Sequence, residues 1–568
     1  RIASPLVGTV VQVHVRVGQL VRAGTELCVI ESMKMEHPIV AECEMRITVV
    51  LATVGEKVGE GTVLLEAQEA TSEVSPQLAQ LEERRSKLED EARPAATTKR
   101  HERGQRTVRE NISDLFDDGT FVEYGGFAVA AQRKRRSVRD LIDNTPADGL
   151  VTGIGLVDGR RCAVLAYDYT VLAGTQGFVN HRKTDRILEV IERERLPVVL
   201  FAEGGGGRPG DVDAPGVAGL DVRSFASFAR LSGLVPLVGI ASGYCFAGNA
   251  ALLGCCDVII ATQNSNIGMA GPAMIEGGGL GKVAPTDIGP IGTQRANGVV
   301  DVVVADEAEA TSVAKRYLAL VSASLAGSAT SSVADASHTP NPSSRTKLRS
   351  IIPAQRTRVY DMREVVRTLA DEGSLLELRR DFAQGAVTAL ARVDGRSVGI
   401  IANVPAHLGG AIDASAADKF ARFIQLCDAF DLPIVSLCDT PGFMVGPEAE
   451  TTGQVRHFAR LFVTAASITV PWITVVVRKG YGLGAQAMAA GSFHAATTTV
   501  AWPTGEFGGM GLEGAVRLGY RKELDAAPDD ASRAALEERL IAAAYEQGAA
   551  LNMAMHIEID DVIDPADT

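Results

Sequence analysis

Two pairs of strand-like segments recur along the chain at almost the same spacing. Residues 196–201 and 432–437 each begin with Leu-Pro and continue with apolar residues, and they start 236 positions apart. Residues 235–240 and 470–475 each begin with Val-Pro and start 235 positions apart. A shared order of strand, loop, strand and turn at one offset is an internal repeat. Because two copies are too few for a solenoid, we expect two duplicated α/β domains.

The Val-Pro segments 235–240 and 470–475 are each followed by a glycine-rich turn. A third glycine-rich stretch, residues 203–208, follows the Leu-Pro segment 196–201. A strand that enters a helix through small residues leaves backbone N–H groups unpaired, and a ligand oxygen can approach them. Such a pocket stabilises a developing negative oxygen. One glycine-rich turn is common in α/β proteins, but two at matching offsets favour paired oxyanion sites. The candidate residues are Gly205, Gly206, Phe246, Ala247 and Gly248 in the first copy, and Leu483 and Gly484 in the second, with Gly482 beside them as a candidate cofactor-binding residue.

A lysine between two methionines, Met33-Lys34-Met35, lies between strand-like runs at residues 27–30 and 39–41. A lone lysine in a turn is normally just a solvated side chain. Two large apolar side chains at a hairpin tip would prefer burial, however. Their presence beside the lysine favours a tip that a modifying enzyme reads.

This tip resembles the biotin carboxyl carrier domain, whose mark is Ala/Val-Met-Lys-Met, with Ser32 here in place of Ala or Val. Lipoyl domains share that fold, but their lysine usually follows Asp and precedes Ala. The resemblance implies a small all-β biotinyl domain of barrel-sandwich type over residues 1–68, followed by a linker over 69–76. It also implies biotin in amide linkage on Lys34, between Met33 and Met35, attached by a biotin protein ligase.

Residues 76–568 resemble the carboxyltransferase of biotin-dependent acyl-CoA carboxylases. The matching motifs are Gly409-Gly410, Asp439-Thr440-Pro441-Gly442-Phe443, Arg478-Lys479-Gly480-Tyr481-Gly482, Ala501-Trp502-Pro503-Thr504 and Met510-Gly511-Leu512-Glu513-Gly514-Ala515. Two motifs depart from the family: Ser-Gly-Gly-Ala-Arg becomes residues 203–208 with four glycines, and Tyr-Gly-Gly-Ala becomes residues 481–484. The resemblance implies two crotonase-like domains, over residues 77–345 and 346–568, and carrier plus carboxyltransferase on one chain resembles the actinobacterial single-chain long-chain acyl-CoA carboxylases.

The implied reaction moves CO₂ from carboxybiotin on Lys34 to the α-carbon of an acyl-CoA, of long chain or of a broad range that includes acetyl- and propionyl-CoA. The first-copy residues are expected to hold the thioester oxygen, and the Leu483 and Gly484 amides the biotin ureido oxygen, although the two halves could be reversed. Gln486 is either a chain-length determinant or a helix-surface glutamine. The alternatives are a biotin-dependent decarboxylase or transcarboxylase, and a non-catalytic carrier scaffold.

Composition bounds the setting and the partners. The 568 residues carry a net charge of −14, which disfavours nucleic acid as a partner, and no apolar run has the length of a membrane span. Eight scattered cysteines without a C-x-x-C pair, and no visible signal peptide, favour a reduced, cytoplasmic setting and no metal site. An anionic CoA ester needs local positive charge, for which Arg133-Lys134-Arg135-Arg136 is one candidate, with a solvated basic loop as the alternative.

Two partners are expected beyond the acyl-CoA. The biotinyl-like unit begins at Arg1 and no glycine-rich nucleotide loop is visible, so the biotin carboxylase that uses ATP and Mg is expected upstream or in another subunit. The family resemblance also implies a homo-oligomer, commonly a hexamer, with active sites between subunits.

Overall fold

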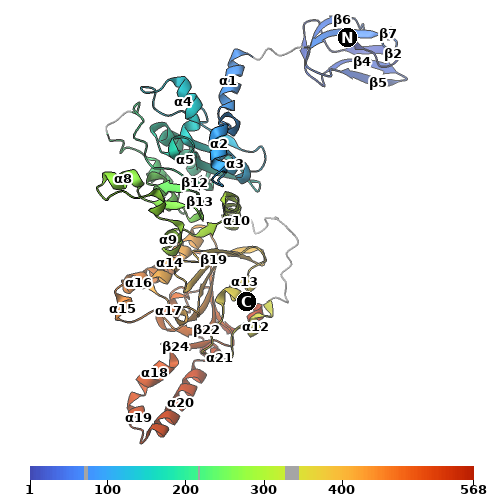
Figure 1. Cartoon of the computed structure of the whole chain (residues 1–568). Coiled ribbons are helices and arrows are strands. Elements are labelled where there is room, and N and C mark those ends of the chain that lie inside the picture. Colours follow the sequence, from blue (N-terminus) through green and yellow to red (C-terminus); the bar gives the residue numbers. More distant parts are fainter. Residues whose placement is uncertain (70–74, 215–217, 326–344) are drawn as a thin grey trace. The chain divides into compact units, whose positions relative to one another are not determined.

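The computed structural model describes residues 1–69, 75–214, 218–325 and 345–568, which form two compact units, Arg1–Arg84 and Arg85–Thr568 (Figure 1). Most of the expected linker at 69–76 lies outside the described residues. No helix within those ranges is both long enough and apolar enough to cross a membrane.

The first unit is an all-β domain of two four-stranded sheets, with strand orders β1-β8-β6-β3 and β5-β4-β2-β7. Every strand pair in it is antiparallel, and one apolar cluster that includes Val10, Leu27, Ile47 and Leu64 fills the domain. Helix α1 (Pro76–Ser86) follows and buries none of its residues. The strands are β1 (Ile2–Ala3), β2 (Gly8–Val13), β3 (Leu20–Val21), β4 (Glu26–Ser32), β5 (Met35–Val40), β6 (Met45–Val50), β7 (Lys57–Val58) and β8 (Val63–Glu69).

The second unit contains two mixed sheets of the same topology, in the orders β17-β15-β13-β12-β11-β10-β9 and β18-β19-β20-β21-β22-β23-β25, with β24 beside β22. Two helices come before the first strand of the first sheet, α2 (Pro94–His101) and α3 (Val108–Leu115). Helix α4 (Val138–Asn144) lies between its first two strands, β9 and β10, in the sequence. The first half then runs β9 (Val122–Tyr124), β10 (Leu150–Val157), β11 (Arg160–Tyr167), α5 (Phe178–Glu194), β12 (Val198–Phe201), α6 (Ser224–Ala229), β13 (Leu237–Ala241), β14 (Tyr244–Phe246), α7 (Gly248–Gly254), β15 (Val258–Thr262), β16 (Asn266–Gly268), α8 (Pro272–Gly277), α9 (Ile291–Ala296), β17 (Val302–Val304) and α10 (Glu307–Leu325).

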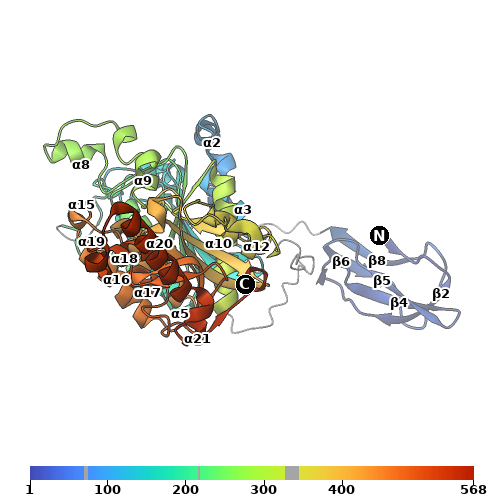
Figure 2. The same cartoon turned by 90° about the horizontal axis from the view of Figure 1, so that it is seen from below.

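The second half ends in a helical arm. Figures 1 and 2 show α18, α19 and α20 side by side beyond the second sheet, and α20 buries none of its residues. This half runs α12 (Leu348–Ile351), α13 (Met362–Leu369), β18 (Leu376–Leu378), β19 (Ala386–Val393), β20 (Arg396–Asn403), α14 (Ala414–Ala429), β21 (Ile434–Thr440), α15 (Pro447–Glu450), α16 (Gln454–Ser467), β22 (Trp472–Tyr481), α17 (Gly482–Ala487), β23 (Thr498–Ala501), β24 (Glu506–Gly508), α18 (Leu512–Gly519), α19 (Arg521–Asp525), α20 (Asp530–Gln547), α21 (Ala550–Met555) and β25 (Asp561–Val562).

The duplication extends to single side chains 236 positions apart. The ammonium group of Lys419 is buried and donates to the carbonyl oxygens of Arg379, Phe382 and Ala386 at 2.7–2.9 Å. Its counterpart Lys183 is also buried and donates to the Leu150 carbonyl, at the start of the equivalent strand. Each lysine therefore satisfies carbonyl groups where a hairpin of the sheet begins, which is a structural role.

The two halves share one core. Tyr317 and Leu320 of α10, in the first half, lie in the same buried cluster as Leu376 and Leu390 of the second half. The sequence placed a domain boundary at residue 345, next to the undescribed segment 326–344, but apolar packing continues across the two halves.

Candidate active site

The Met33-Lys34 tip is a two-residue hairpin turn between β4 and β5. Ser32 pairs with Met35, and both turn residues have left-handed backbones, with φ of 53° at Met33 and 66° at Lys34. This conformation is that of a type I′ turn, which favours Asn-Gly because other residues are strained in it. Met33 is 96% exposed and Met35 is 65% exposed. The tip thus has a strained backbone and presents two apolar side chains and a lysine to solvent.

The tip fits an amide-linked cofactor. Lys34 is exposed and forms no ion pair with any described residue, so its amine is open to acylation. The Ser32 hydroxyl donates to the Val7 carbonyl oxygen at 2.7 Å, which ties the base of the hairpin to the neighbouring chain. An exposed amine on a turn whose base is held in place is accessible to an enzyme that attaches a cofactor in amide linkage.

The first glycine-rich loop, residues 204–207, follows β12 and packs against the turn before α7. Gly206 has φ of +86°, and a Cβ atom on it would lie 2.6 Å from the Ala247 Cβ. Gly205 donates its amide to the Ala173 carbonyl at 3.0 Å, and Gly206 donates its amide to Asn249 Oδ1 at 3.0 Å. Both amides are therefore already engaged, which corrects the prediction that they face a ligand.

The turn before α7 needs the same correction. Phe246 donates its amide to the Gly204 carbonyl, and Ala247 donates its amide to the Gly268 carbonyl. Among the described residues, no acceptor pairs with the amides of Gly207 and Gly248. In the described loop and turn these two amides are free donors, and only Gly248 was predicted. We call this pair the first amide site.

The second copy repeats this arrangement. The carbonyl of Gly442 accepts the Ile412 amide at 3.1 Å, and the Gly206 carbonyl accepts the Gln176 amide at 2.7 Å. Donor and acceptor of the second bond each lie 236 positions before their counterparts in the first. Gly442 donates its own amide to Thr440 Oγ1 at 3.1 Å. The amides of Phe443, Leu483 and Gly484 have no acceptor in the described part of the chain. We call these three the second amide site.

Phe443 was not among the predicted site residues. A Cβ atom on Gly484 would lie 2.9 Å from the Phe443 amide nitrogen, so the two donors sit on adjoining backbones. Gly207 and Phe443 are 236 positions apart. Extending the repeat one residue past Gly206 and Gly442 would have identified both.

 Two cavities lie in the second unit. One, of about 440 Å³, lies between its two halves and is lined by residues that include Asp257, Asp301 and Lys419. The cavity at Gln486 measures about 610 Å³ and runs from Gly482 along the helical arm. Its lining mixes polar side chains with apolar ones, the latter including Phe507, Leu512, Val516, Leu540 and Met553. An exposed glutamine that lines such a cavity beside apolar side chains is well placed to act on an acyl chain.

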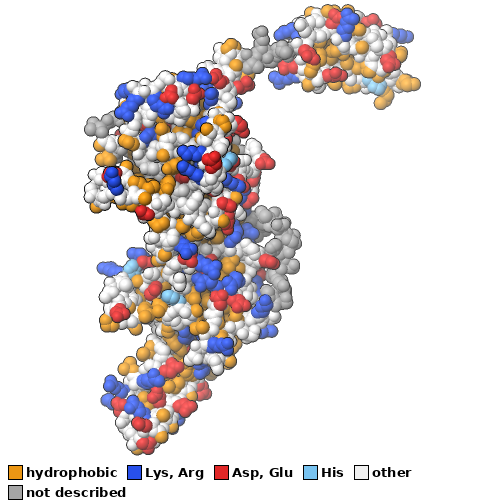
Figure 3. All heavy atoms as spheres, in the orientation of Figure 1, with side chains coloured by type: hydrophobic (Ala, Val, Ile, Leu, Met, Phe, Trp, Pro, Cys, Tyr) orange, Lys and Arg blue, Asp and Glu red, His pale blue; other side chains and the backbone are white. Residues whose placement is uncertain are grey.

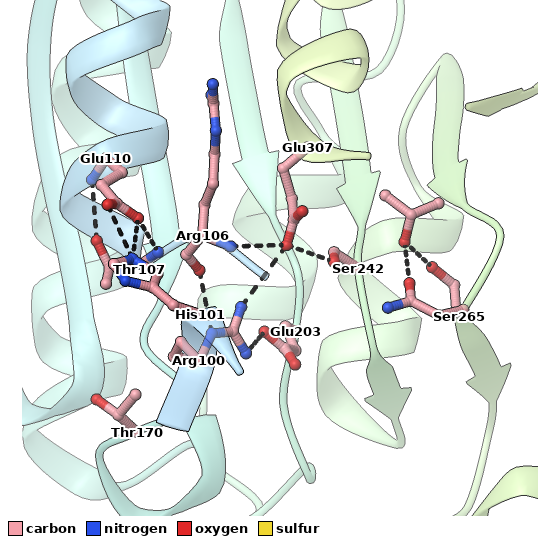
Figure 4. A network of polar contacts seen from close by, with 12 residues as sticks. Arg100, His101, Arg106, Thr107, Glu110, Thr170, Glu203, Ser242, Ser265 and Glu307 are labelled. Atoms are coloured by element: carbon pink, nitrogen blue, oxygen red, sulfur yellow. Dashed lines mark hydrogen bonds and ion pairs between the residues drawn. The ribbon is translucent and has the colours of Figure 1, made fainter. Parts of the chain in front are cut away.

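A buried acid anchors the loop of each copy. Glu203 precedes the first glycine loop and accepts a hydrogen bond from Arg100 Nη1 at 2.7 Å, within a network that also holds Ser242 and Glu307 (Figure 4). Its counterpart Asp439 accepts from Arg478 Nε at 3.1 Å and from the Tyr360 hydroxyl at 2.8 Å. Burial raises the pKa of Glu203 to about 7, although the charge of Arg100 lowers it.

This pKa predicts how stability depends on pH. Because the folded state binds the Glu203 proton more tightly than the unfolded chain does, the carboxyl stabilises the fold most below about pH 4.5, and this contribution is lost as pH rises through about 7. Relative to Glu203→Gln, we expect the wild-type unfolding free energy to fall by up to roughly 3 kcal/mol from about pH 5 to about pH 8. Denaturation curves at both pH values measure it. Glu102→Gln, an exposed acid that follows α2, is the control, and a pH-independent difference at Glu203 contradicts the prediction.

The site is built from backbone amides. Across the described ranges, no group of three or more His, Cys, Asp or Glu side chains is placed to hold a metal ion. The two amide sites share one pair of equivalent donors, Gly207 and Gly248 in the first and Phe443 and Gly484 in the second. At loops braced by buried acids, they are suited to stabilise two separate oxyanions.

The comparisons with known proteins agree with this construction. Residues 99–568 match the family model described as the carboxyl transferase domain. The chain belongs to the carboxyl transferase family. Residues 1–66 of this carboxyltransferase match the model described as biotin-requiring enzyme, so the predicted biotinyl domain, crotonase-like fold and family are confirmed.

Its relatives include both transferases and carboxylases. The methylmalonyl-CoA carboxyltransferase 12S subunit of Propionibacterium freudenreichii subsp. shermanii is 35% identical over 505 residues, which cover 88% of this chain and 93% of that relative. The biotin-dependent long chain acyl-coenzyme A carboxylase beta4 subunit of Mycobacterium tuberculosis is 32% identical over 512 residues, or 86% of this chain and 92% of that relative.

Two solved structures are similar over nearly the whole carboxyltransferase. A single-chain, multi-domain long-chain acyl-CoA carboxylase is 54% identical with a TM-score of 0.80, and the match covers 99% of this chain and 55% of that protein. The chain therefore spans about half the length of that carboxylase. The transcarboxylase 12S hexamer is 32% identical with a TM-score of 0.76, covering 88% of this chain and 94% of that protein.

Proposed function

We propose that this chain is the carrier and carboxyltransferase part of a biotin-dependent acyl-CoA carboxylase that accepts long-chain or a broad range of acyl-CoA substrates. The observation that carries the proposal is the pair of amide sites, built twice from residues 236 positions apart, on a chain that also presents Lys34 on a strained tip. The 54% identity to a long-chain acyl-CoA carboxylase, against 32% to the transcarboxylase structure, supports a carboxylase over the alternatives.

The residues have the following roles. The Gly207 and Gly248 amides hold the thioester oxygen, which becomes negative when the α-carbon gives up its proton. The second amide site holds the ureido carbonyl oxygen of biotin. Biotin, when bound to Lys34, supplies the carboxyl group that is transferred and takes up the α-proton. A single donor of this kind is worth about 3–4 kcal/mol of transition-state stabilisation.

The assembly follows from this division of roles. The two amide sites lie on different halves of one chain, and we propose that the first site of one copy works with the second site of a neighbour in a homo-oligomer, as a hexamer. The solved transcarboxylase 12S structure is a hexamer, which supports this arrangement. A cytoplasmic biotin carboxylase, which uses ATP and Mg, and a biotin protein ligase complete the set of partners.

An isotope exchange assay tests the proposal. The biotinylated chain, without ATP, should exchange label between radioactive propionyl-CoA and unlabelled methylmalonyl-CoA, because that exchange needs only the carrier and the carboxyltransferase. Absence of exchange in a fully biotinylated oligomer would favour the non-catalytic scaffold. Adding a biotin carboxylase, ATP and bicarbonate should then give net carboxylation of the acyl-CoA. A decarboxylase is not expected to give this net product.

Gln486 is expected to influence acyl-chain selectivity. Replacing it with Ile exchanges a polar group in the cavity lining for an apolar one, so the ratio of kcat/KM for palmitoyl-CoA over acetyl-CoA should rise about tenfold, since one methylene in an apolar pocket is worth roughly 1–3 kcal/mol. Rates on acetyl-, propionyl- and palmitoyl-CoA measure the effect. A common loss on all three substrates would make Gln486 structural, and no change would move the search to residues 271–292.

A further inference from the structure

A basic loop, residues 132–136, is fixed beside the first amide site. Arg133, Lys134 and Arg135 are exposed, but their backbone is held in place. The Asp213 carboxylate accepts the amides of Arg133 and Lys134, the latter at 3.1 Å, and the Asp213 amide donates to the Ala131 carbonyl at 3.0 Å. The loop therefore has a defined path although its side chains reach into solvent.

One carboxylate joins this loop to the residues that shape the amide site. Asp211 Oδ1 accepts from Gln132 Nε2 at 3.1 Å, and Asp211 Oδ2 accepts the Phe178 amide at 2.9 Å, at the start of α5. Arg208, which directly follows Gly207, contacts Asp211 at 3.5 Å and forms a buried ion pair with Asp148. The basic loop and the Gly207 amide are thus parts of one hydrogen-bonded structure.

The positive charge of the loop is only partly neutralised. Lys134 Nζ donates to the Val212 carbonyl at 3.0 Å, and Arg136 pairs with Asp140. The oxygens of Asp213 are occupied by backbone amides, and the Arg133 and Arg135 guanidinium groups form no ion pair with described residues. Figure 3 shows Lys and Arg side chains over the end of the unit that carries α4. In a chain of net charge −14, two unpaired arginines beside an acyl site call for an anionic ligand.

We propose that the basic loop binds the nucleotide phosphates of the CoA thioester while the acyl end lies at the first amide site. This inference rests on the proposed function and adds the part of the substrate that the loop recognises. Guanidinium groups bind phosphate through paired, charge-assisted hydrogen bonds, and a loop with a fixed backbone loses less entropy when its side chains engage.

The test compares two thioesters on one variant. In the double variant Arg133→Gln/Arg135→Gln, kcat/KM for exchange between propionyl-CoA and methylmalonyl-CoA should fall about tenfold, as expected for two exposed charge contacts. Exchange between the corresponding pantetheine thioesters, which lack the nucleotide and its phosphates, should be unchanged. Raising the salt concentration should reduce the difference between wild type and variant on the CoA substrates.

Arg139→Gln is the matched control. It removes a positive charge from nearby α4, where Arg139 pairs with Asp143, and should leave both exchange rates at the wild-type level. An equal loss on CoA and pantetheine thioesters, or no loss on the CoA thioesters, overturns the phosphate assignment. Failure of the proposed function looks different, because wild type would then exchange neither kind of thioester.

Discussion

Replacing Lys34 with Arg abolishes biotin attachment and, with it, exchange between acyl-CoA thioesters that depends on the carrier. Arginine keeps the positive charge and a long side chain, so the exposed turn should fold as before. Its guanidinium stays protonated above pH 12 and cannot form the amide that lysine forms. Streptavidin blotting and intact-mass spectrometry measure attachment, and the exchange assay measures the consequence.

The chain offers a control and a rescue for this variant. Lys57→Arg changes an exposed lysine of β7 in the same domain and should retain full biotinylation. Free biotin added to Lys34→Arg should restore part of the exchange, because the amide sites are intact. A streptavidin signal that survives in Lys34→Arg would place the attachment at another lysine.

Gly484→Ala should lower kcat by about 10²–10³-fold, the loss typical of one missing oxyanion donor. The new Cβ would lie 2.6 Å from the Gly442 carbonyl carbon and 2.9 Å from the Phe443 nitrogen, so the backbones that carry the donors must move apart. Alanine is the better helix former, so α17 itself should not be destabilised. Exchange kinetics measure the loss, and the variant should still be biotinylated.

Gly511→Ala is the control, because a Cβ there has no heavy atom within 4 Å. It should keep near wild-type kcat. If Gly484→Ala also keeps full activity, the Phe443 and Gly484 amides do not act together on the reacting oxygen.

Local sequence patterns were enough to predict the Lys34 tip and the duplicated sheets. The tip at Lys34 could be recognised because a two-residue turn leaves its side chains few alternatives to exposure, whatever surrounds it. The duplicated sheets could be recognised because each strand and turn leaves the same residue types at the same spacing, and the topology follows from that order. Residues 236 positions apart match in backbone pairing even where their types differ, as Gln176 and Ile412 show.

Which amides remain without an acceptor was decided only by the tertiary structure. Gly205 and Gly206 were plausible donors on composition, but their amides are taken by Ala173 and by Asn249, which come from other segments of the chain. Within the described glycine loops, the free donors are Gly207 and Phe443, one residue further along. A hydrogen bond between segments far apart in the chain leaves no local pattern, so a glycine-rich turn predicts that an oxyanion site is present, whereas the packing around it determines which N–H groups remain to form it.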